Sequence, residues 1–139
     1  MTRFVVDCSA VLRLASEPIA IPPEHELLAP TLLRSQTLSA LHEVAHRGEL
    51  GADVALERLA RIGAMRIRLL GDAVLRRRAW ELAERLGWPE TYDAEYVALT
   101  QLQADALVTL DAELGRRLEG VVAVAPIEAL RATGAGTER

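Results

Sequence analysis

The chain alternates short apolar runs with longer segments in which hydrophobic residues recur every three or four positions. The short runs predict strands at 4–6, 66–70, 106–110 and 121–125, and a further strand or extended lead-in at 27–29. The longer segments predict helices at 10–14, 30–48, 52–62, 72–86, 91–102 and 112–118, and one that begins at 127. Because the strands are apolar throughout rather than alternating with polar residues, they predict a parallel sheet with helices on both faces, an α/β fold.

Residues with special backbone preferences mark the ends of several predicted helices. Ser9 is expected to cap the first helix, and Pro30 to open the second in its first turn. Gly48 and Gly87 suit the position just after a helix, and Thr91 is expected to cap the helix that follows. The second and third helices succeed each other at once, so they predict a helical hairpin.

Length and composition predict one compact domain at 1–132 and a frayed tail at 133–139. No apolar run approaches the ~20 residues that span a bilayer. No leader-like segment stands before the first strand, so we expect a cytoplasmic protein without a membrane partner. The single cysteine, Cys8, excludes an internal disulfide and a cysteine-based zinc site, and its expected role is that of a buried filler. A net charge of −4 excludes no nucleic-acid partner, because local patches decide such binding.

Three aspartates stand where a parallel sheet places its chemistry. Asp7 and Asp111 directly follow short apolar strands, whose carboxyl ends face the ligand crevice in such a sheet. Asp93 lies in the first turn of a helix, where the helix dipole alone would favour a carboxylate. Three carboxylates that converge would repel one another unless a cation joined them. Oxygen-only ligands suit Mg²⁺ or Mn²⁺, which activate water for attack on a phosphodiester.

Four segments in order give the chain a family resemblance, at 5–12, 29–33, 91–99 and 106–111. Together they resemble the motifs of PIN-domain nucleases, and at this length the chain is most similar to the VapC toxins of bacterial toxin–antitoxin pairs. The resemblance implies a PIN-like three-layer α/β/α fold with a short central parallel sheet. It also implies an endoribonuclease that depends on Mg²⁺ or Mn²⁺, forms a homodimer and is inhibited by a cognate antitoxin protein.

The resemblance assigns roles to individual residues. Asp7, Asp93 and Asp111 match the acids of the family's metal site, which hydrolyses RNA through a metal-activated water. Ser9 and Thr109 match hydroxyl positions beside those acids, although a helix cap and an ordinary strand residue explain them equally well.

One position departs from the family pattern. The helix predicted to begin near Pro30 carries a glutamate in the family, and Gln36 stands there in this chain. An amide can still accept a hydrogen bond but brings no charge, so metal affinity is expected to fall. Two interpretations follow. The first is a weakened or specialised nuclease, in which Gln36→Glu should raise Mn²⁺ affinity and RNA cleavage. The second is a degenerate domain that binds antitoxin or RNA without efficient cleavage.

Residues 42–46 read His-Glu-Val-Ala-His, the pattern of zinc metalloproteases on a predicted helix. The other histidine, His25, lies upstream, so no third histidine follows the motif. Glu49 stands where the extended zinc-protease motif has glycine. We therefore treat a zinc metalloprotease as the less favoured alternative.

Arginines offer the remaining candidate contacts. Arg34, Arg76 and Arg77 are candidates to bind RNA phosphates. The competing interpretation of the arginines at 76–78 is a solvated helix face that pairs with Glu81 and Glu84, and this interpretation is preferred.

Overall fold

The computed structural model describes residues 1–131, which form a five-stranded sheet surrounded by helices. In chain order the elements are β1 (Thr2–Val6), α1 (Cys8–Ser16), β2 (His25–Pro30), α2 (Leu32–His46), α3 (Ala52–Ala64), β3 (Ile67–Leu70), α4 (Ala73–Leu86), α5 (Tyr92–Gln103), β4 (Ala106–Val108), α6 (Ala112–Arg117), β5 (Val124–Ala125) and the 3₁₀ helix η1 (Ile127–Leu130). The expected tail at 133–139 lies outside the described residues.

All strand pairs of the sheet are parallel, in the order β3-β2-β1-β4-β5. Phe4 of β1 lies opposite Leu27 of β2 on one side and Ala106 of β4 on the other. The chain therefore builds the sheet outward from β1 in one direction and then returns to the other side of β1. A parallel sheet whose strand order reverses has a crevice at that point, between β1 and β4 here.

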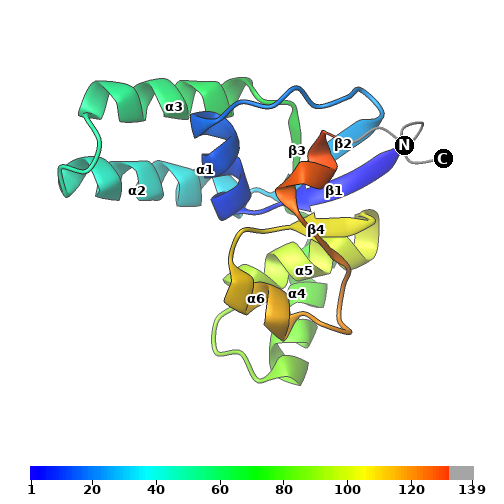
Figure 1. Ribbon diagram of the computed structural model, residues 1–139. Helices are drawn as coiled ribbons and strands as arrows, with labels where there is room; N and C mark the ends of the chain where they lie inside the picture. Colours follow the sequence, from blue (N-terminus) through cyan, green and yellow to red (C-terminus); the bar gives the residue numbers. More distant parts are fainter. Residues whose placement is uncertain (132–139) are drawn as a thin grey trace.

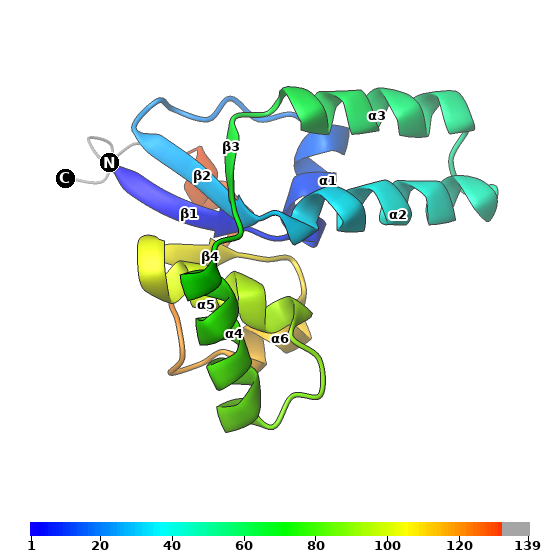
Figure 2. The same cartoon turned by 180° about the vertical axis from the view of Figure 1, so that it is seen from behind.

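Helices cover both sides of the strands, which confirms the predicted three-layer α/β/α arrangement (Figures 1 and 2). Helix α5 packs on β1, β2 and β4, and α4 lies against α5. Helices α1 and α3 lie on the other side of the strands. The α2–α3 hairpin, predicted from the sequence, extends beyond the carboxyl ends of the strands.

The buried core consists mainly of aliphatic side chains from the central strands and their covering helices. Val5, Leu28 and Leu107, on three neighbouring strands, are fully buried. Because these strands are buried on both faces of the sheet, their sequences are unbroken apolar runs. Among the described residues, no helix is both long and apolar enough to cross a membrane.

Two predicted helix starts are wrong. The first helix is capped by Asp7 rather than Ser9, because the Asp7 carboxylate accepts a hydrogen bond from the backbone N–H of Ala10 at 3.0 Å. Pro30 does not open α2 but ends β2, where it lies opposite Leu70. A proline tolerates this place because a strand end needs no donor from it. The segment at 27–29 is thus part of a strand, β2, which runs from His25 through Pro30.

Other helix ends follow their expected residues. Gly87 has a φ of 73°, the left-handed conformation that ends α4. Gly48 has a φ of 76° just after α2. Thr91 holds the cap position of α5, although its side chain makes no capping hydrogen bond. The last two strands are shorter than predicted, and the final helix is a single 3₁₀ turn.

Candidate active site

A chain of hydrogen bonds joins the carboxyl ends of β1 and β4. The Ser9 hydroxyl donates to Asp7 Oδ1 at 2.7 Å and accepts from the Leu110 backbone N–H at 2.9 Å. The hydroxyl oxygens of Ser9 and Thr109 lie 3.4 Å apart, and Thr109 accepts from the backbone N–H of Asp111 at 3.1 Å. These bonds hold Asp7 and Asp111 at the neighbouring ends of β1 and β4. Ser9 does not cap α1, and Thr109 lies just past β4.

The two strand-end aspartates also begin the helices that follow them. Asp7 caps α1, and Asp111 caps α6 by accepting from the backbone N–H groups of Glu113 and Leu114, both at 3.1 Å. In each case the bonds go to Oδ1 alone. The Oδ2 atoms of both side chains accept no hydrogen bond from residues 1–131. Capping thus holds each carboxylate in place while leaving one oxygen for another ligand.

Asp93 is held by a cation rather than by a cap. Its Oδ2 lies 3.5 Å from Nη2 of Arg117, and both side chains are partly exposed. The Arg117 guanidinium also lies over the Trp88 ring, 5.1 Å from the centroid. The Asp93 Oδ1 atom accepts no hydrogen bond within the described chain. Arg117 was not foreseen from the sequence, because nothing in the spacing of the two residues links α6 to the start of α5.

Tyr96 is a second site residue that the sequence did not indicate. It lies one helical turn after Asp93, and its hydroxyl donates to Gln36 Oε1 at 2.6 Å, which joins α5 to α2. Burial raises the pKa of Tyr96, and the charges of Cys8, Asp7, Glu95 and Asp93 raise it further. The tyrosine ring therefore lies within the electrostatic reach of Asp7 and Asp93 and stays protonated.

The donor set fits a hard divalent cation in chemistry. Three carboxylates, each with one oxygen that accepts no hydrogen bond from residues 1–131, are the ligands that Mg²⁺ and Mn²⁺ prefer. Among residues 1–131, however, no three His, Cys, Asp or Glu side chains are already grouped as ligands of one ion. The aspartates therefore do not form a preassembled centre, and an ion would have to draw their side chains together.

Comparisons with known proteins identify the family of the chain. No family model matches the chain. Ribonuclease VapC9 of Mycobacterium tuberculosis and VapC ribonuclease Mb0985 of Mycobacterium bovis are each 36% identical to it over 120 residues, covering 80% of this chain and 87% of the relative. The chain belongs to the VapC ribonuclease family. Its PIN-like fold also matches solved structures in which the sequence has diverged further.

Two such structures share the fold of this VapC family member. PAE2754 from Pyrobaculum aerophilum superposes with a TM-score of 0.71 at 24% identity, covering 93% of both chains. VapBC-1 from nontypeable Haemophilus influenzae gives a TM-score of 0.62 at 12% identity, covering 91% of this chain and 98% of that one.

The arginines proposed from the sequence lie in different surroundings. Arg76 lies close enough to Glu95 to lower its pKa, although burial of Glu95 has the larger and opposite effect and raises it. Arg34 and Arg77 are exposed, and their side chains form no hydrogen bond or ion pair within the described residues. The predicted pairing of the 76–78 arginines with Glu81 and Glu84 is not found among these residues. Arg78 instead donates to Gln101.

The His-Glu-Val-Ala-His motif forms an exposed face near the end of α2. The rings of His42 and His46 stack with centroids 6.2 Å apart and an interplanar angle of 14°. Within the described part of the chain, no third Asp, Glu, Cys or His joins them as a metal ligand. A catalytic zinc needs three protein ligands and a water, so the two histidines lack a partner for protease chemistry.

We expect the double variant His42→Ala/His46→Ala to keep its RNA cleavage within about twofold of the wild type, because both side chains are exposed surface groups. Metal analysis of the wild type should find well under one zinc per chain after dialysis. A zinc content near one per chain that falls in the double variant would revive the protease alternative.

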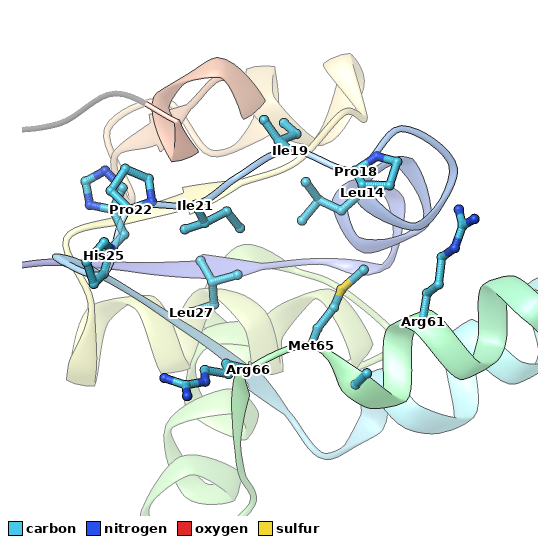
Figure 3. Close-up of a pocket in the computed structure, with 12 residues that line it drawn as sticks. Leu14, Pro18, Ile19, Ile21, Pro22, His25, Leu27, Arg61, Met65 and Arg66 are labelled. Carbon is cyan, nitrogen blue, oxygen red and sulfur yellow. The ribbon is translucent and has the colours of Figure 1, made fainter.

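Two further features lie apart from the aspartates. Burial, followed by the charge of Asp7, raises the pKa of the Cys8 thiol to about 11, so it stays protonated and unreactive at neutral pH. A pocket of about 610 Å³ is lined by mainly apolar residues, among them Leu14, Leu27 and Met65 (Figure 3). It lies at the beginnings of β2 and β3, opposite the strand ends that carry the acids.

Proposed function

We propose that this VapC family member is an endoribonuclease that depends on Mg²⁺ or Mn²⁺ and acts as the toxin of a type II toxin–antitoxin pair. Asp7, Asp93 and Asp111 would hold the ion directly or through water. The observation that carries the proposal is the hydrogen-bonded chain that fixes Asp7 and Asp111 where the strand order reverses. Relatives named as ribonucleases support the reaction class.

The residues of the chain prepare the site for a phosphodiester. Ser9 and Thr109 hold the ends of β1 and β4 together, which keeps Asp7 and Asp111 at neighbouring strand ends, where an ion could draw their free oxygens together. Arg117 offsets the charge of Asp93 until a stronger cation competes for it. A bound Mg²⁺ or Mn²⁺ would supply a more acidic water and charge neutralisation at the phosphate. Arg34, Arg76 and Arg77 remain candidate phosphate contacts.

The proposed partners rest on related proteins. VapBC-1 from Haemophilus influenzae and VapBC2 from Rickettsia felis share this fold, the latter with a TM-score of 0.59 at 10% identity, covering 89% of this chain and 98% of that one, which supports a cognate antitoxin as the protein partner. The homodimer belongs to the same proposal and rests on the family resemblance. A cytoplasmic location is part of the same proposal.

The rival proposal is a degenerate domain that binds antitoxin or RNA without efficient cleavage. It is favoured by Gln36, which stands where the family carries a glutamate and leaves the site with three carboxylates. The two proposals differ in one measurable property, the dependence of RNA cleavage on metal and on the aspartates.

The deciding experiment is cleavage of a mixed RNA pool by purified protein in Mn²⁺, in Mg²⁺ and in EDTA. We expect cleavage in either metal, none in EDTA and none in Asp93→Ala. Cleavage that continues in EDTA or in Asp93→Ala would contradict the metal-site assignment. Absence of metal-dependent cleavage in the wild type, with retained RNA binding, would favour the degenerate domain.

We expect Arg117→Gln to raise the Mn²⁺ affinity of the RNA-free protein by up to about fivefold, because the ion would no longer compete with the guanidinium for Asp93. Exposed ion pairs contribute about 0.2–1 kcal/mol, which sets this range. Titration with Mn²⁺ followed by electron paramagnetic resonance measures the affinity. Arg116→Gln is the matched control, since that neighbour is exposed and pairs with no acid among residues 1–131. Equal affinities in the two variants would show that Arg117 does not compete.

A further inference from the structure

The hydrogen bond between Tyr96 and Gln36 determines which end of the glutamine amide is available. The hydroxyl donates to Oε1 over 2.6 Å, and the tyrosine is 2% exposed, so little water competes for the bond. Gln36 is half-buried, and its side chain forms no other hydrogen bond within the described residues. One lone pair of its carbonyl oxygen is thus taken by Tyr96, and neither N–H of its amide nitrogen is used; that nitrogen carries two donors and no lone pair for a metal.

The tyrosine keeps this arrangement at any physiological pH. Its pKa is raised by burial and by the neighbouring Cys8, Asp7, Glu95 and Asp93, so the hydroxyl retains the proton that it donates. A hydroxyl has one proton, and this one is directed at Gln36. The amide is planar, so fixing Oε1 also fixes the direction of Nε2.

The side chains around Tyr96 and Gln36 are acidic, so a hydrogen-bond donor would help a phosphate to bind there more than a further acceptor would. Asp7 and Asp93 both exert a negative charge on Tyr96, and Glu95 lies on the same helix. An RNA phosphate that approaches these acids before any cation meets repulsion. A neutral amide nitrogen at position 36 offers a hydrogen bond to a phosphate oxygen, whereas a carboxylate there would add to the repulsion.

We propose that Gln36 is a substrate-binding residue that donates from Nε2 to a phosphate oxygen of RNA, and that Tyr96 is the positioning residue that holds the amide in this orientation. The proposal rests on RNA being the substrate, as proposed above. It gives Gln36 a role different from that of a weakened metal ligand. It also predicts that RNA binding at this contact requires no metal.

The test is binding of a fluorescein-labelled single-stranded RNA in EDTA, followed by fluorescence anisotropy. We expect Gln36→Leu to bind several-fold more weakly than the wild type and Gln36→Glu to bind about tenfold more weakly, because the carboxylate repels the phosphate. Gln103→Glu, the same change at an exposed residue at the end of α5, is the matched control and should bind within twofold of the wild type.

The positioning role is tested by a double-mutant cycle. Tyr96→Phe should weaken RNA binding several-fold when residue 36 is glutamine and should have no further effect when residue 36 is leucine. An equal loss in both backgrounds would show that Tyr96 acts through the general fold, and would overturn the positioning role. Circular dichroism melting of each variant confirms that the compared proteins are folded.

The remaining outcomes are also decisive. A wild type that does not bind RNA in EDTA, or a Gln36→Glu variant that binds as well as the wild type, overturns the inference. Metal-free RNA binding with the expected losses, but no cleavage in Mn²⁺, supports the inference and contradicts the nuclease proposal. Cleavage in Mn²⁺ with no change in metal-free binding among the variants contradicts the inference and supports the nuclease proposal.

Discussion

Asp7→Asn should lower the rate of Mn²⁺-dependent RNA cleavage by about 100-fold or more while leaving the protein folded. Substituting a residue that only orients a metal ligand typically lowers metal affinity or activity about 10–100-fold. Loss of the charge of a ligand itself should have a larger effect. The choice of asparagine matters because Asp7 also caps α1. Asparagine caps a helix about as well as aspartate, so its effect reports on charge rather than on helix stability. Initial rates on a labelled RNA at saturating Mn²⁺ measure the change.

Asp53→Asn is the matched control for this variant. Asp53 is exposed in the first turn of α3 and forms no ion pair among residues 1–131. Its substitution should change cleavage by less than twofold. A fall in the cleavage rate as large as that of Asp7→Asn would indicate a general effect of removing a negative charge. Cleavage by Asp7→Asn near the wild-type rate would remove Asp7 from the site.

The position of the strand-end acids could be predicted because it depends on local pattern. An apolar run that stops at Asp7 marks the end of β1, and another that stops just before Asp111 continues two residues past the end of β4. The parallel arrangement then places both ends at one edge of the sheet. That β1 and β4 are neighbours follows from the strand order, which the sequence does not show directly.

Contacts between distant elements could not be predicted in the same way. The ion pair of Asp93 with Arg117 and the hydrogen bond of Tyr96 with Gln36 depend on how α6 and α2 are placed relative to α5. Capping was misassigned for a related reason. Asp7 and Ser9 are both good caps, and only the backbone shows which of them precedes the first helical turn.

Gln36→Glu should raise the Mn²⁺ affinity of the RNA-free protein by about tenfold, or ~1.4 kcal/mol. The substitution adds a fourth carboxylate near Asp7 and Asp93, whose charges already reach the Tyr96 hydroxyl that Gln36 binds. That hydroxyl can donate to a carboxylate oxygen as it does to the amide, so the side chain should stay in place. Cleavage at saturating RNA and limiting Mn²⁺ should therefore rise above the wild-type rate.

Gln103→Glu, which adds the same charge at an exposed position, again serves as the control, because long-range attraction alone would affect both variants. If the two variants bind Mn²⁺ equally, residue 36 does not face the ion. A gain in Mn²⁺ affinity together with the expected loss of metal-free RNA binding would show that one side chain decides between two tasks. On that result, glutamate at position 36 would favour the cation and glutamine would favour the phosphate, so the natural sequence would exchange part of its metal affinity for substrate binding.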